Sequence, residues 1–152
     1  MNLEWFRCKE VGWCDLSKID IENDYVKESI GVFMCWTGSE MDNSSIILKV
    51  GQGYIFDVIL DLRENTSIKA FESKGVYFTW ARCATYQLDR VEVFLHKHYK
   101  PVMPNEDLPK SRAKKVKLPW DEEEIRLLKE QLNKPNFGES DEEKKKEKKL
   151  PW

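Results

Sequence analysis

Hydrophobic positions between residues 31 and 100 follow two periods, and each stretch of one period predicts an element. The stretch "GVFMCW" at 31–36 is apolar at every position, which indicates a strand buried on both faces. Turn residues separate it from a second β-branched run, "SIILKVG" at 45–51, so the two runs predict a β-hairpin. The run "GVYFTWARCA" at 75–84 is rich in β-branched and aromatic residues and predicts a third strand.

Two other stretches have helical spacing. Apolar residues three and four positions apart predict an amphipathic helix at Ile55, Val58, Ile59 and Leu62. Residues 87–100, "QLDRVEVFLHKHYK", predict a second helix that Pro101 ends. The pattern therefore predicts a fold of the α/β (α+β) class, in the order strand, strand, helix, strand, helix.

Glu92 falls inside the apolar stripe of the second helix. The stripe consists of Leu88, Val91, Leu95 and Tyr99. A buried carboxylate without a partner is strongly unfavourable. We therefore expect either a cationic group beside Glu92 or a position at a partly exposed edge of the stripe.

Charge and aromatic content divide the chain near residue 104. Aromatic residues and cysteines are concentrated before Pro104, which places the globular domain at roughly 1–104. This part holds 12 Lys and Arg against 15 Asp and Glu, and residues 105–152 hold 13 against 12. A mildly acidic domain argues against strong non-specific binding of nucleic acid by the core.

Cysteine spacing gives no sign of a metal site. Cys8, Cys14, Cys35 and Cys83 form no CxxC pair, and the two histidines are not arranged with them as zinc ligands. We expect reduced structural thiols. With no signal-peptide pattern and no apolar run approaching the ~18 residues that span a bilayer, we expect a cytoplasmic protein with no membrane partner.

The order of elements, with a glutamate on the last helix, resembles the GIY-YIG nuclease domain, a family that includes homing endonucleases and the incision subunit of bacterial excision repair. "GVF" at 31–33 stands where this family has GIY on its first strand, and "KVG" at 49–51 where it has YIG on its second. The last family motif, E-x-x-L-x-x-x-Y-x-P, is intact at Glu92, Leu95, Tyr99 and Pro101. The resemblance covers roughly residues 31–105.

The resemblance implies a small three-stranded antiparallel sheet flanked by helices, with the active groove on one face. It also implies a mechanism for active members. A Mg or Mn ion held by the glutamate polarises a phosphate, the motif tyrosines orient or deprotonate the attacking water, and an arginine stabilises charge on the phosphorane. On this basis Glu92 is the expected metal ligand.

The chain departs from the family at the other chemical positions. Phe33 replaces the first tyrosine and has no hydroxyl, and Lys49 replaces the second. Val58 stands near the place of the arginine, and Arg63 lies five residues further, about 140° around the helix. Each missing group contributes roughly 10²–10⁴-fold in rate, so we expect a degenerate nuclease.

A candidate binding set surrounds these motif positions. Gly51 and Gly53, with Gln52 between them, would let the chain leave the strand and start the helix without Cβ clashes. Lys49 is expected to point toward Glu92, its ammonium standing where a metal would; a solvent-facing lysine and a phosphate contact are the alternatives.

The rest of that set lies on the two helices. His96 follows Glu92 by one helical turn and could join the site, and a surface or core-edge histidine is the alternative. Arg63 and Tyr99 complete the set.

The two ends of the chain are interpreted separately. Residues 1–30 are too apolar for a free tail and are expected to pack on the sheet, ahead of the GIY-YIG-like domain at 31–104. Residues 105–120 form a basic linker whose segment 110–117 holds five basic residues, for phosphates, an acidic partner or solvent.

Beyond the linker, residues 121–134 predict an amphipathic helix with a capping box, and 135–152 a disordered charged tail. The helix and the repeated "KLPW" at 117–120 and 149–152 are candidate docking elements for another protein, although the repeat is equally compatible with coincidence.

Three functions remain open. The first is a degenerate GIY-YIG nuclease that binds nucleic acid or protein. The second is an active metal-dependent endonuclease using Glu92, and the third is an interaction protein that uses the C-terminal helix.

Overall fold

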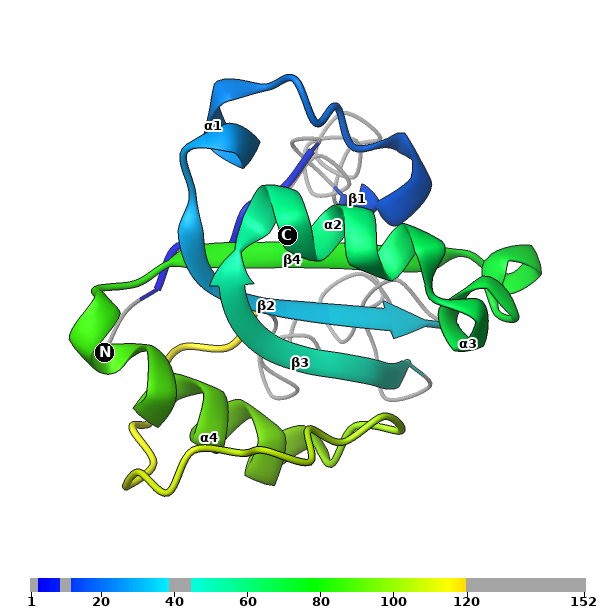
Figure 1. Ribbon diagram of the computed structural model, residues 1–152. Helices are drawn as coiled ribbons and strands as arrows, with labels where there is room; N and C mark the ends of the chain where they lie inside the picture. The colour runs from blue at the N-terminus through cyan, green and yellow to red at the C-terminus, as the bar shows by residue number, and fades with distance from the viewer. Residues whose placement is uncertain (1–2, 9–11, 39–44, 120–152) are drawn as a thin grey trace, which may run out of the picture.

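A computed structural model describes residues 3–8, 12–38 and 45–119 of the chain. Four strands form one antiparallel sheet in the order β1-β4-β2-β3 (Figure 1). The strands are β1 (Cys14–Asp15), β2 (Ile30–Thr37), β3 (Ile46–Tyr54) and β4 (Val76–Arg82). The expected α+β class is confirmed, with β2 and β3 forming the predicted hairpin.

One strand more than expected lies at the β4 edge of the sheet. The short β1 pairs with β4 through Cys14 opposite Phe78. Nearby, Phe6 N donates to Trp80 O at 2.8 Å, and the two rings stack with centroids 4.2 Å apart. The N-terminal residues thus pack on the sheet and also lengthen it. A two-residue strand is too short to leave a periodic signal in the sequence.

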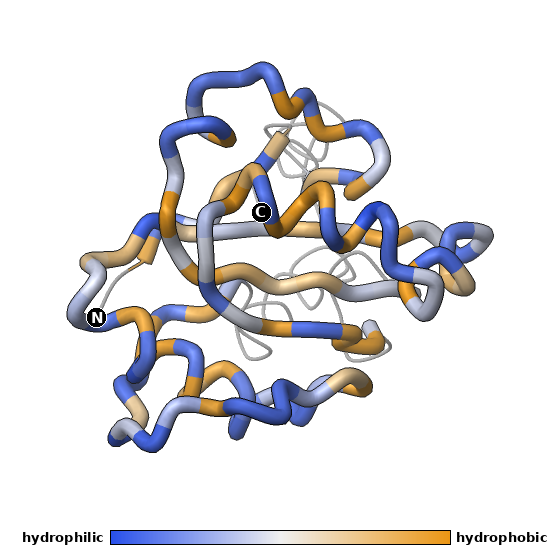
Figure 2. Tube along the Cα trace, viewed as in Figure 1, coloured by the Kyte–Doolittle hydropathy of each residue, from blue (hydrophilic) through white to orange (hydrophobic). Residues whose placement is uncertain are grey.

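Two main helices cover opposite faces of the sheet. Helix α2 (Ile55–Glu64) crosses the near face in Figure 1. Helix α4 (Leu88–Tyr99) packs on the opposite face, next to β3. The alternation of apolar and polar residues along α2 is visible in Figure 2. Shorter helical turns are α1 (Asp24–Lys27), α3 (Thr66–Lys69) and 3₁₀ turns at Leu16–Lys18, Glu72–Lys74 and Thr85–Gln87. None of the helices in the described ranges is long and apolar enough to cross a bilayer.

Each face of the sheet has its own hydrophobic core. The α2 side contains Phe33, Cys35, Leu48, Ile59 and Trp80, among others. The α4 side contains Val32, Met34, Trp36, Val50 and the helix residues Leu88, Val91 and Leu95. The predicted stripe of α4 is therefore the face that packs on the sheet.

The chain after α4 returns along the edge of the sheet. Val102 N donates to Ile47 O at 3.0 Å, and Met103 N to Leu48 O at 2.9 Å, so this stretch covers the free edge of β3. Residues 105–119 then run beside α4 (Figure 1), and Val116 is buried in the α4-side core. This stretch was expected as a linker, and it packs on the domain instead.

The cysteines correct an expectation. Cys8 and Cys14 form a disulfide, with Cα atoms 4.9 Å apart, whereas Cys35 and Cys83 are free. Antiparallel pairing of β1 brings Cys14 back beside the N-terminal stretch that holds Cys8, a proximity that no spacing motif reveals. Burial raises the pKa of the Cys35 thiol to about 12 and also raises the pKa of Cys83.

Several expectations concern residues outside the described ranges. These are the helix at 121–134, the tail at 135–152, and the KLPW segments apart from residues 117–119.

Candidate functional site

A groove of 470 Å³ opens where β3 approaches α4. Its walls come from four separate parts of the chain, and the lining residues are Phe33, Lys49, Gly51, Gln52, Glu92, Pro104, Asn105, Glu106 and Asp107. Five of the residues expected at a functional site therefore meet there, namely Phe33, Lys49, Gly51, Gln52 and Glu92.

Glu92 is the buried acid of this groove, with 7% of its surface exposed. Its Oε1 accepts from Asn105 Nδ2 at 2.8 Å, and its Oε2 accepts from Gln52 Nε2 at 2.8 Å. Hydrogen bonds to a charged acceptor are worth roughly 1.5–3 kcal/mol each. Two neutral amides thus offset the desolvation of this carboxylate.

Both amides bridge Glu92 to a second acceptor. Gln52 Nε2 also donates to Asp89 Oδ1 at 2.6 Å, one helical turn before Glu92. Asn105 Nδ2 also donates to Val50 O at 3.0 Å, on the backbone of β3. Each amide nitrogen carries two hydrogens, so both are fully used. The network therefore ties β3, α4 and the returning chain together.

The expected contact between Lys49 and Glu92 is not formed within the described residues, where Glu92 has no cationic partner. Lys49 lies opposite Cys35, which belongs to the α2-side core, whereas Glu92 comes from α4 on the other side. The β-bulge of this pair lies before Lys49, and the register from Lys49 to Tyr54 is regular, so alternation puts Lys49 on the face opposite to Val50 of the α4-side core. The proposed substitution of a lysine for a metal is therefore wrong for this structure.

The space beside Gly51 is occupied by the Phe33 ring and is not open to a ligand. A Cβ at Gly51 would lie 2.9 Å from the Phe33 ring, which is 4% exposed and packs in the α2-side core. The residue at the position of the first family tyrosine thus fills space beneath the second motif. It brings no polar atom to the groove.

Gly53 lies near the end of β3 and Val58 in the first turn of α2, and neither lines the groove. Val58 packs against the α2-side core, and a Cβ at Gly53 would lie 3.2 Å from Val58 Cγ2. Gly53 has φ of 155°, a value that residues with a side chain rarely adopt. Glycine therefore avoids both backbone strain and a tight contact with Val58. At the position of the family arginine the chain therefore makes an apolar packing contact.

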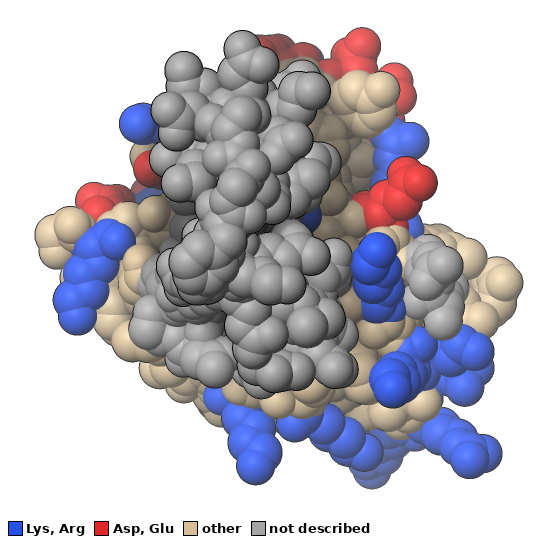
Figure 3. All heavy atoms as spheres, turned by 180° about the vertical axis from the view of Figure 1, so that it is seen from behind, with Lys and Arg blue, Asp and Glu red and all other residues tan. Residues whose placement is uncertain are grey.

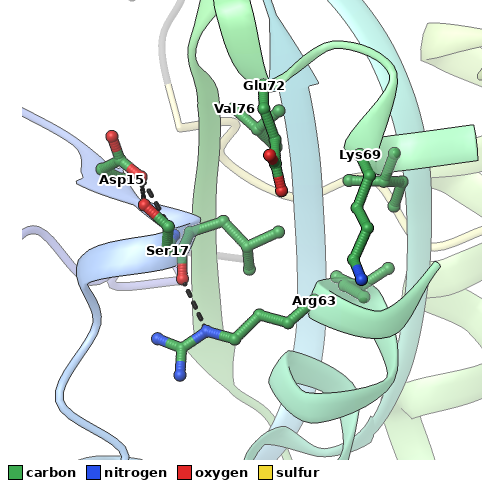
Figure 4. A pocket seen from close by; sticks show the side chains of 9 residues that line it. Asp15, Ser17, Arg63, Lys69, Glu72 and Val76 are labelled. Carbon is green, nitrogen blue, oxygen red and sulfur yellow. Dashed lines mark hydrogen bonds between the residues drawn. The ribbon is translucent and has the colours of Figure 1, made fainter. Parts of the chain in front are cut away.

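Arg63 lies in a different cavity, of 320 Å³, on the α2 side of the sheet (Figure 4). Its Nε donates to Leu16 O at 2.9 Å and its guanidinium to Ile19 O at 2.6 Å. The arginine therefore holds the N-terminal segment against α2. It does not contribute to the groove of Glu92.

His96 and Tyr99, on α4, do not line the groove. His96 Nε2 accepts from Asn105 N at 3.2 Å, so the imidazole positions the residue that holds Glu92. Tyr99 packs in the α4-side core. His96 was considered as a member of the site or as a surface or core-edge histidine; it does not line the groove, and it contacts the site through the backbone of Asn105.

Two residues of the network were missed by sequence reasoning. Asp89 precedes Glu92 by three residues on the same helix face, a spacing that could have revealed it. Asn105 lies in irregular chain beyond Pro104, and only the tertiary return along β3 brings it to Glu92. No local pattern marks such a residue.

The groove is acidic. Glu92, Glu106 and Asp107 face one cation, Lys49, and neither tyrosine nor arginine is among its lining residues. Within the described ranges, no three His, Cys, Asp or Glu side chains are placed to hold a metal together. Glu92 alone would have to serve, with water and substrate supplying the other ligands, as Mg²⁺ often permits.

Comparison with family models, curated proteins and solved structures gives no match to this chain.

Proposed function

We propose that this chain is a GIY-YIG-like domain that binds nucleic acid and has lost the capacity to cleave it. The observation that carries the proposal is the position of Glu92. The acid of the intact last motif lies beside Gln52, next to the residues that stand in for the second motif, within the element order of that family.

Loss of cleavage follows from the chemistry of the groove. A phosphodiester entering it would meet three carboxylates and one ammonium, with no hydroxyl from Phe33 and no guanidinium from Val58. Without a tyrosine hydroxyl to orient the attacking water and a guanidinium to meet the charge on the phosphorane, the transition state loses two of its main sources of stabilisation. The hydrogen bonds from Gln52 and Asn105 to Glu92 stabilise the fold whether or not the groove cleaves a phosphodiester.

The test is incubation of the purified protein with duplex, branched and single-stranded DNA and with RNA, in Mg²⁺ or Mn²⁺. We expect retained nucleic acid of unchanged length, with wild type, Glu92→Gln and the matched control Glu106→Gln all alike. Cleavage that Glu92→Gln abolishes and Glu106→Gln preserves would overturn the loss of activity. Failure to retain any of the nucleic acids would overturn the binding role.

One observation favours a second candidate, an active metal-dependent endonuclease. Asp89 and Glu92 share the amide of Gln52, so two carboxylates lie within one helical turn at the rim of the groove. The same cleavage assay separates the two candidates.

A further inference from the structure

Basic side chains gather away from the groove, on a segment that the fold holds in place. We call residues 110–117 the basic strap; it contains Lys110, Arg112, Lys114, Lys115 and Lys117. Seen from behind, Lys and Arg line the lower edge of the molecule, where α4 and this segment lie, whereas the visible Asp and Glu side chains are in the upper half (Figure 3). In this view the lower edge is therefore predominantly basic, although some Lys and Arg also lie in the upper half.

The strap is fixed to the domain by its backbone. Lys114 N donates to Arg90 O at 3.1 Å, and Arg90 Nε donates to Arg112 O at 3.1 Å. Further along, Trp5 Nε1 donates to Lys117 O at 2.6 Å. These bonds use backbone atoms of the strap and leave its cationic side-chain groups to face outward.

Burial of Val116 sets the direction of its neighbours. Val116 is 5% exposed in the α4-side core, and the lysines on either side of it are exposed. In an extended chain, positions two apart lie at most about 7 Å from each other. Lys115 and Lys117 are therefore two exposed lysines that leave the chain close together, from a backbone that the fold holds in place.

We propose that the basic strap is the surface that binds the phosphate backbone of nucleic acid. The inference rests on the proposed function and locates its binding surface. Duplex DNA carries one negative charge per ~1.7 Å of axis, which a row of closely spaced cations complements. The groove has the opposite sign, so the backbone lies along the strap and α4, outside the cleft at Glu92.

Salt dependence of binding tests the location. Binding of a labelled DNA duplex is measured against salt concentration for wild type, for Lys115→Gln/Lys117→Gln, and for the control Lys18→Gln/Lys74→Gln. The control removes the same charge at two exposed lysines outside the strap. We expect the log–log salt slope to fall in magnitude by about 2 in the strap variant, near one per lysine, and to stay unchanged in the control.

The outcomes are distinct. Binding by wild type with equal slopes in both variants overturns the strap and leaves the proposed function intact. No binding by wild type overturns the proposed function itself. Displacement of the duplex by polyglutamate, or capture by anionic lipid vesicles, at matched charge concentration overturns the assignment to nucleic acid, because an acidic protein or a membrane would then fit equally well.

Discussion

Glu92 is a buried charge whose partners are neutral. Its two oxygens each accept one amide hydrogen, from Asn105 and from Gln52. The amides have no net charge, so the site keeps its negative sign. Contact with Lys49 would have cancelled that sign. Lys49 leaves β3 on the α2 side of the sheet, so its ammonium does not reach Glu92. On the proposed GIY-YIG resemblance, the site has the acid of the last motif but not the tyrosine and arginine expected around it.

The reactivity of the four cysteines toward alkylation can also be predicted residue by residue. The thiolate is the reactive form, and a pKa of about 12 leaves Cys35 almost entirely protonated near neutral pH. In the native protein without reductant, we expect iodoacetamide to modify Cys83 slowly and Cys35 only after unfolding. Cys8 and Cys14 should react only after reduction.

Peptide mapping by mass spectrometry reads all four positions in one sample. Modification of Cys8 or Cys14 in the unreduced native protein would show that the disulfide is not formed.

At the scale of elements, periodicity predicted most of the architecture. Strands β2, β3 and β4 and helices α2 and α4 lie where the apolar patterns place them. The patterns could not reveal β1, which spans two residues, or the bulge between β2 and β3 at Cys35 and Trp36. They also could not reveal Asn105, because its contact depends on how the chain returns after α4.

The pairing of β2 with β4 makes a prediction about Gly31. A Cβ at this position would overlap the carbonyl oxygen of Ala81 and lie 2.8 Å from its carbonyl carbon, on the backbone of β4. We expect Gly31→Ala to lower the free energy of unfolding by about 1–3 kcal/mol or more, measured by urea denaturation, because two central strands must separate.

The matched control is Gly51→Ala, where the added Cβ meets the Phe33 side chain instead of backbone. The Phe33 ring can shift at a lower cost in free energy than a strand. Gly51→Ala should therefore lower the free energy of unfolding less than Gly31→Ala does. An equal or smaller loss for Gly31→Ala would contradict the described approach of β2 and β4.

At the scale of the whole molecule, sequence-distant segments are joined at one site. Gln52 on β3, Glu92 on α4 and Asn105 on the returning chain form a single hydrogen-bond network. Arg63 makes a comparable link on the other side, between α2 and the N-terminal segment. The acidic groove and the basic strap lie on different parts of one surface, so the proposed binding surface is separate from the groove that holds Glu92.

The central claim is that this carboxylate joins three parts of the chain. The most direct measurement is NMR of the side-chain amides of Gln52 and Asn105 in wild type, Glu92→Gln and the control Glu106→Gln. We expect slowly exchanging amide signals that shift in Glu92→Gln and stay in place in Glu106→Gln. Signals that exchange as fast as those of exposed amides, or that ignore the change at Glu92, would contradict it.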